Sequence, residues 1–192
     1  MQFRLFSKDL LLRILFLKRI RLSKKDGNNL TEILIKETDT PLDKQYQLLI
    51  KQMRNLLNKE EKLISNLANA SAALKETFDK ISWVGFYLYD GGNLYLGPFQ
   101  GKVACTRIEL GKGVCGTSAK EKKSIVVPDV NKFPGHIFCD VDSRSEIVIP
   151  ILKDGNFLGV LDIDSTSFNS FDDTDRIYLE EFCNFLSVEI FS

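Results

Sequence analysis

The chain has 192 residues with four cysteines, one histidine, and equal numbers of basic and acidic side chains, 26 of each. This length suits one compact domain with an appendage, and four cysteines are too few for a disulfide-rich secreted scaffold. A hydrophobic content of 44% with a charged content of 27% is ordinary for a globular protein, which excludes a disordered or fibrous chain.

The zero net charge hides an uneven distribution along the chain. Residues 1–25 carry eight lysines and arginines and one acid, so the remainder has an excess of acids. A protein that binds nucleic acid needs clustered basic residues to neutralise phosphates, and no such cluster follows residue 25. We therefore expect no nucleic-acid partner.

Residues 1–30 form a basic, leucine-rich segment. Its apolar run 10–17 is interrupted by Arg13, has no small-residue cleavage site after it, and is too short for a membrane-spanning helix of about 20 residues. A helix on an anionic membrane surface, a flexible extension and a translation start read too early all remain open. We predict an extension outside the core, a domain over residues 40–192, and a cytoplasmic protein without membrane attachment.

Two helices are predicted next. Pro41 suits a first helical turn, and apolar residues then recur at three- and four-residue spacing as far as Leu57. A second amphipathic helix is expected over about Glu60–Phe78.

From Trp83 the period of the pattern changes to two. Strands are expected at 83–89 and 94–99 around the turn Asp90-Gly91-Gly92-Asn93, then at 107–110, 124–127, 146–152 and 157–163. A short helix is expected over 114–120, an ordered loop over 133–145, and a last helix over 174–191 capped by Asp172 and Asp173. This order predicts an α+β fold, with a central antiparallel sheet of about five or six strands flanked by N- and C-terminal helices.

The cysteines have no C-x2-C spacing, and the chain has one histidine, so we predict no structural metal site. Cys183 falls among apolar residues of the last helix and is expected in the core. Cys105, Cys115 and Cys139 lie on loops or at a helix start, and a helix N-terminus favours the thiolate of Cys115. They are candidates for redox or nucleophilic chemistry in a reducing compartment, with plain burial as the alternative.

Three acids are expected near one another. Asp162 and Asp164 are two apart on one strand and share a face, and Glu146 begins the strand that pairs with it. Crowded carboxylates raise the pKa of at least one of them. A solvated charge pair at a strand edge is the alternative.

Six separated motifs occur in an order that resembles one family. They are Trp83-Val-Gly-Phe-Tyr87, Ala104-Cys105-Thr-Arg-Ile108, Gly113-Val-Cys115-Gly-Thr117, Gly135-His-Ile-Phe-Cys139-Asp140, Ser145-Glu146-Ile-Val-Ile-Pro150 and Gly159-Val-Leu-Asp162-Ile-Asp164-Ser165. The chain from about residue 41 to residue 191 is similar to the free methionine-(R)-sulfoxide reductases, enzymes built on a GAF domain. The resemblance implies a GAF-like fold.

The resemblance also implies a role for each matching residue. Cys139 would attack the substrate, and Cys105 would be the principal resolving cysteine. Cys115 matches a further cysteine of the family, as an alternative resolving residue. Glu146, Asp162 and Asp164 would bind the substrate, with one acid protonating the sulfoxide, and Trp83 and Tyr87 would form the pocket wall. His136, three residues before Cys139, is expected to be a loop hydrogen-bonding residue.

The implied reaction reduces free methionine-(R)-sulfoxide to methionine. It needs no bound cofactor, because an intramolecular disulfide is recycled by an external dithiol such as thioredoxin. The R preference comes wholly from the resemblance. A GAF sensor that binds a small ligand without turnover and a thiol redox switch are the alternatives, and a homodimer is left open.

Overall fold

The computed structural model describes residues 19–20, 33–34, 40–135 and 141–191. A six-stranded antiparallel sheet forms its centre, with the strand order β5-β4-β3-β8-β7-β6. The strands are β3 (Trp83–Tyr89), β4 (Asn93–Gln100), β5 (Arg107–Glu109), β6 (Ile125–Val127), β7 (Ser145–Lys153) and β8 (Asn156–Ser165). The predicted α+β class and strand number are confirmed.

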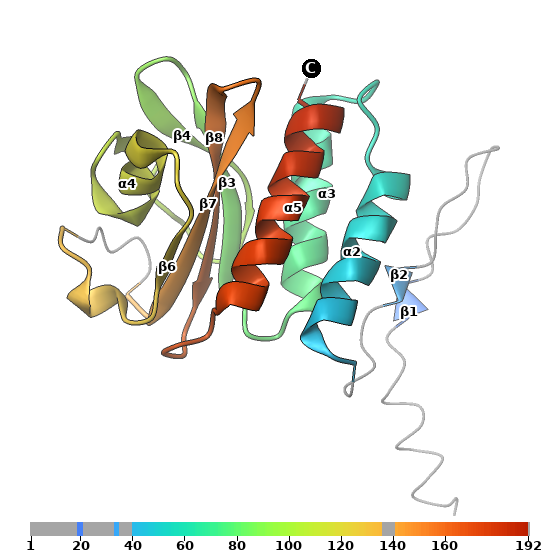
Figure 1. Ribbon diagram of the computed structural model, residues 1–192, viewed down its shortest axis with the longest axis horizontal. Helices are drawn as coiled ribbons and strands as arrows, with labels where there is room; N and C mark the ends of the chain where they lie inside the picture. Colours follow the sequence, from blue (N-terminus) through green and yellow to red (C-terminus); the bar gives the residue numbers. More distant parts are fainter. Residues whose placement is uncertain (1–18, 21–32, 35–39, 136–140, 192) are drawn as a thin grey trace, which may run out of the picture.

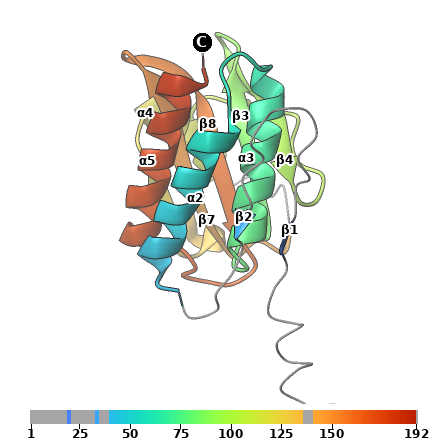
Figure 2. The same ribbon diagram turned by 90° about the vertical axis from the view of Figure 1, so that its right-hand side faces the viewer.

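Three helices lie on one side of the sheet, two of them packed on its strands and the third packed on those two, and one short helix lies on the other side (Figure 1). The first three are α2 (Leu42–Leu56), α3 (Leu63–Thr77) and α5 (Asp173–Glu189), and the fourth is α4 (Gly113–Glu121). Figure 2 shows α2, α3 and α5 side by side in front of the strands. The sheet is therefore the middle of three layers.

The alternation of side chains along the strands produces two apolar cores. On β7 and β8, Ile147 and Ile163 pack against the helix layer, whereas Val148 and Val160 belong to a second cluster on the α4 side. That second cluster also contains Trp83 and Tyr87 of β3. Period-two alternation thus divides the side chains of the sheet between the face under the helix layer and the face under α4.

Some predicted boundaries differ from the structure. The second helix begins at Leu63 rather than near Glu60, because the side chain of Asn58 accepts a hydrogen bond from the Glu60 amide, and Asn66 bonds both backbone groups of Asn58. The last helix ends at Glu189, and a short 3-10 helix, η1 (Val130–Lys132), precedes the predicted loop. Asp172 is the N-cap of α5, as predicted, and forms a capping box with Asp175.

In the N-terminal segment the structure describes only β1 (Arg19–Ile20) and β2 (Ile33–Leu34), which pair antiparallel. The interpretations of residues 1–30 otherwise lie outside the described residues. In the part of the chain that is described, no helix has the length and apolar character needed to cross a membrane.

Candidate active site

The three predicted acids meet at one end of the β7–β8 hairpin. Glu146 lies directly opposite Asp164 in the register of these strands, and Asp162 lies opposite Val148 two residues along. Residues opposite each other in an antiparallel pair have side chains on the same face. All three acids therefore lie on the α4 side of the sheet, and Glu146 and Asp162 are buried.

Cys115 lies against these acids. It is the third residue of α4, which packs on β7 and β8. Potential ligand atoms of Cys115, Glu146 and Asp162 all lie within 4.8 Å of one another. The α4 helix thus brings one of the predicted cysteines to the acid cluster.

The electrostatics of this cluster favour protonated groups. Burial, followed by the charge of Asp164, raises the pKa of Glu146, and burial with the charge of Glu146 raises the pKa of Asp162. One oxygen of Asp162, Oδ1, is buried and has no hydrogen-bond partner among the described residues. The expectation that crowding raises at least one carboxyl pKa is confirmed, and the solvated-pair alternative does not fit such burial.

The expected thiolate at Cys115 is wrong. Burial raises the pKa of this thiol well above its ordinary value, and the neighbouring charges of Asp162 and Glu146 raise it further. Because the favourable helix N-terminus is outweighed by lost hydration and adjacent carboxylates, Cys115 is a neutral thiol.

Trp83 and Tyr87 form an aromatic wall on the same face, with ring centroids 6.2 Å apart. Trp83 donates from Nε1 to the carbonyl of Lys102 at 2.9 Å, and Tyr87 donates from its hydroxyl to the carbonyl of Cys105 at 3.0 Å. The backbone of Cys105 is therefore bonded to this aromatic wall, and Cys105 itself is partly exposed.

The sequence reasoning missed the residues that hold Trp83. Phe99 stacks on its indole, with ring centroids 5.5 Å apart and planes inclined by 18°. A Cβ at Gly85 would lie 2.5 Å from Trp83 Cη2, so the indole packs where only glycine leaves room. In the sequence, the position of Gly85 between the aromatic residues of β3 was the pattern that could have predicted this packing.

Two predicted residues, Cys139 and His136, lie outside the described residues. Cys183 is buried among the phenylalanines of α5, as predicted, and its thiol pKa is raised by burial.

The residues that could hold a metal ion are Cys115, Glu146 and Asp162, the one such group among the described residues. A thiol with two carboxylates is a ligand set that zinc accepts.

Comparisons with known proteins identify the family. The GAF domain model matches residues 62–190. The chain is 54% identical over 145 residues to GAF domain-containing protein A of Dictyostelium discoideum, which covers 75% of this chain and 91% of that protein. It is 47% identical over 131 residues to the free methionine-R-sulfoxide reductase of Escherichia coli, covering 68% of this chain and 79% of that enzyme.

The chain belongs to the free methionine-(R)-sulfoxide reductase family of GAF domains. A solved structure agrees: the free methionine-R-sulfoxide reductase of Neisseria meningitidis, in complex with its substrate, has a TM-score of 0.76 and 42% identity, covering 81% of this chain and 93% of that one. The family resemblance drawn from the motifs and the GAF fold are both confirmed. Membership of the free methionine-(R)-sulfoxide reductase family gives the cluster of acids, thiol and aromatics a chemical context.

Proposed function

We propose that this protein reduces free methionine-(R)-sulfoxide to methionine. The observation that carries the proposal is the convergence of Glu146, Asp162, Cys115 and the Trp83–Tyr87 wall on one sheet face. Relatives that are named free methionine-R-sulfoxide reductases support it at 47% and 48% identity.

The acids suit a free amino acid. A carboxylate cluster that is buried attracts a cation, and the ammonium group of a free amino acid supplies one. The same crowding keeps a proton on one carboxyl, for which Glu146 is the candidate, and that proton activates the sulfoxide oxygen. Trp83 and Tyr87 would contact the thioether end, where a sulfur–aromatic contact contributes roughly 0.3–1.5 kcal/mol.

The proposed chemistry runs in three balanced steps. The Cys139 thiolate and one proton reduce the sulfoxide, methionine leaves, and Cys139 becomes a sulfenic acid. The thiol of Cys105 then condenses with the sulfenic acid, forming a disulfide and releasing water, with Cys115 as an alternative resolving thiol. A dithiol protein such as thioredoxin restores both thiols by exchange and is itself oxidised, without a bound cofactor.

The raised pKa of the Cys115 thiol favours Cys105 as the resolving residue. Resolution needs a thiol that can ionise, and Cys115 is buried beside two carboxylates, whereas Cys105 is partly exposed. We propose residues 40–192 as the catalytic unit, acting in the reducing cytoplasm where a dithiol reductant is available.

Replacing the attacking thiol tests this function. Cys139→Ser is expected to abolish consumption of free methionine-(R)-sulfoxide in the presence of a dithiol, because serine cannot form a sulfenic acid. Cys183→Ala is the matched control, since Cys183 lies in the helix-side core, and it should retain turnover. Unchanged turnover in Cys139→Ser would contradict the proposal and favour another nucleophile.

A GAF sensor without turnover is the alternative function. The buried acid cluster would serve such a sensor equally well as a ligand site. It is distinguished by binding of methionine sulfoxide without any methionine formed.

A further inference from the structure

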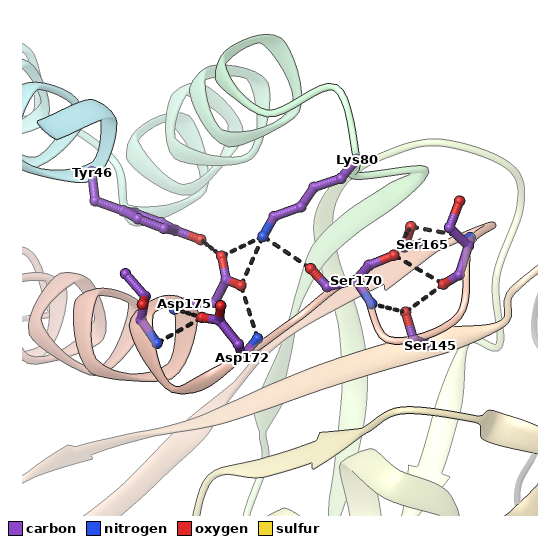
Figure 3. A network of polar contacts seen from close by, with 9 residues as sticks. Tyr46, Lys80, Ser145, Ser165, Ser170, Asp172 and Asp175 are labelled. Carbon is purple, nitrogen blue, oxygen red and sulfur yellow. Dashed lines mark hydrogen bonds and ion pairs between the residues drawn. The ribbon is translucent and has the colours of Figure 1, made fainter. Parts of the chain in front are cut away.

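A largely buried polar network joins the helix layer to the ends of β7 and β8 (Figure 3). Its centre is Asp175 of α5, whose side chain has no exposed surface. Lys80, from the connection between α3 and β3, donates to both carboxylate oxygens of Asp175 at 2.6 and 2.7 Å. Tyr46 of α2 donates its hydroxyl to Oδ1 of the same carboxylate at 2.7 Å. Three separate elements therefore meet at one carboxylate.

Lys80 extends this network to the β8–α5 connection. Its Nζ donates to the carbonyl of Ser170 at 3.0 Å. The hydroxyl of Ser170 lies 2.8 Å from that of Ser165 and donates to the carbonyl of Ser167 at 2.9 Å. The amide of Ser170 donates to the hydroxyl of Ser145 at 3.3 Å. Ser170 thus bonds both strands that carry the acids.

Ser145 and Ser165 form the terminal pair of the β7–β8 ladder, and the next pair is Glu146 with Asp164. Neighbouring residues on a strand point to opposite faces. The two serines therefore point toward the helix layer, and the two acids point toward the α4 side of the sheet. A displacement of the serine pair on one face moves the acid pair on the other, because each serine shares a peptide bond with an acid.

The same strand end is bonded to the predicted loop over 133–145. The amide of Arg144 donates to the carbonyl of Ser165 at 2.8 Å, and its guanidinium donates to the carbonyl of Val141 at 3.0 Å. The amide of Ser82 donates to the carbonyl of Asp164, also at 2.8 Å. The end of β8 is therefore a junction between the pocket acids and the chain that leads back to Cys139.

We propose that Ser170, held by the Lys80–Asp175 pair, is a positioning residue that fixes the separation and direction of Glu146 and Asp164. Its effect on turnover rests on the proposed function, whereas its effect on the geometry of the acids does not. Among the hydrogen bonds of the described residues, those of Ser170 reach Ser145 and Ser165, the strand neighbours of the two acids.

Three variants of the full chain test the positioning role. Ser170→Ala removes the hydroxyl that bonds Ser165 but keeps the amide that bonds Ser145. Ser170→Thr keeps the hydroxyl at a site that is only partly buried. Ser187→Ala is the matched control, because this buried hydroxyl on α5 donates to the carbonyl of Asn184 at 2.9 Å and to no other residue that the structure describes. For each protein, kcat and KM for free methionine-(R)-sulfoxide are measured well below the melting temperature, and a crystal structure records the Glu146–Asp164 geometry.

The positioning role predicts a change in both kinetic constants. Ser170→Ala should raise KM about tenfold and also lower kcat, because the displaced acids bind the substrate and Glu146 supplies the proton to the sulfoxide oxygen. The acid pair should be displaced in its crystal structure, Ser170→Thr should restore KM to within about twofold, and Ser187→Ala should keep the wild-type constants. These results together would support the inference.

Other results would overturn it. An unmoved acid pair with wild-type KM in Ser170→Ala would show that the Ser170 hydroxyl does not position the acids. A threonine variant as impaired as the alanine variant would show that the hydroxyl is not responsible. Failure of the proposed function is distinguishable: the wild-type protein would then lack turnover, while the acid pair in Ser170→Ala would still move.

Discussion

At the scale of single residues, Asp162 illustrates a conflict between function and stability. Its carboxyl group is buried beside Glu146 and Cys115, and within the described part of the chain one of its oxygens has no hydrogen-bond partner. An acid whose pKa is raised in the folded protein ionises more readily in the unfolded chain. Asp162 therefore opposes folding at neutral pH, which is a cost that a ligand-binding role would justify.

Replacing Asp162 by asparagine should make this cost visible. The folded chain holds the proton of Asp162 to higher pH than the unfolded chain, so its penalty is absent below the unfolded pKa of about 3.9 and grows as the pH rises above it. Asp162→Asn is expected to increase the free energy of unfolding at pH 7, and by less at about pH 4. Urea unfolding at both pH values measures this, and a variant that is less stable than the wild type at pH 7 would contradict the account. Substrate binding should weaken in the same variant.

At the scale of elements, the N-terminus of α5 joins the helix layer to the sheet. Asp175 completes the capping box with Asp172 and also accepts from Lys80 and Tyr46. Burial, with the charge of Asp175 as the next cause, raises the pKa of Tyr46. One buried carboxylate therefore stabilises a helix end and the packing of α2 on α5.

Asp175→Ala should unfold much more easily than the wild type. The change leaves the ammonium of Lys80 and the hydroxyl of Tyr46 without their partner, and breaking a buried ion pair typically costs about 3–5 kcal/mol. The midpoint of urea unfolding reports the loss. Asp173→Ala is the control, because the Asp173 side chain is 85% exposed and pairs only with Arg176 among the described ion pairs. Equal midpoints for the two variants would contradict this role of Asp175.

The elements themselves could largely be predicted from the sequence, because period-two and helical patterns are local. The Glu146–Asp164 proximity was also accessible, since a tight turn at Asp154-Gly155-Asn156 sets the register of the hairpin. The serine network was not predictable, because it joins Lys80, Ser145 and Ser170 across three connections. The raised pKa of the Cys115 thiol escaped prediction for a related reason: burial against β7 and β8 is a tertiary property, which outweighs the local effect of the helix N-terminus.

At the scale of the whole molecule, α2 is the first helix of the described core. Among the residues whose side chains the structure describes, Leu42 is the first that packs against a hydrophobic cluster. The GAF domain model likewise matches only residues 62–190. The domain proposed over residues 40–192 therefore contains the described core and every proposed site residue.

Removal of residues 1–39 is accordingly expected to leave catalysis and stability unchanged. The GAF domain model matches only residues 62–190, so the urea midpoint and kcat/KM of the shortened chain should equal those of the full chain. A large fall in either quantity would show that the N-terminal segment forms part of the working domain. Full-length protein purified in parallel is the control.

The central claim is that the cysteines reduce a free sulfoxide by forming one disulfide. Reduced protein, freed of external thiols, is mixed with an excess of free methionine-(R)-sulfoxide, and the remaining thiols and the methionine formed are both counted. The account predicts the loss of two thiols per chain, matched by one methionine per chain, and neither change in Cys139→Ser. Methionine sulfoxide left unchanged with all thiols intact, or thiols lost only to peroxide with no methionine formed, would contradict it.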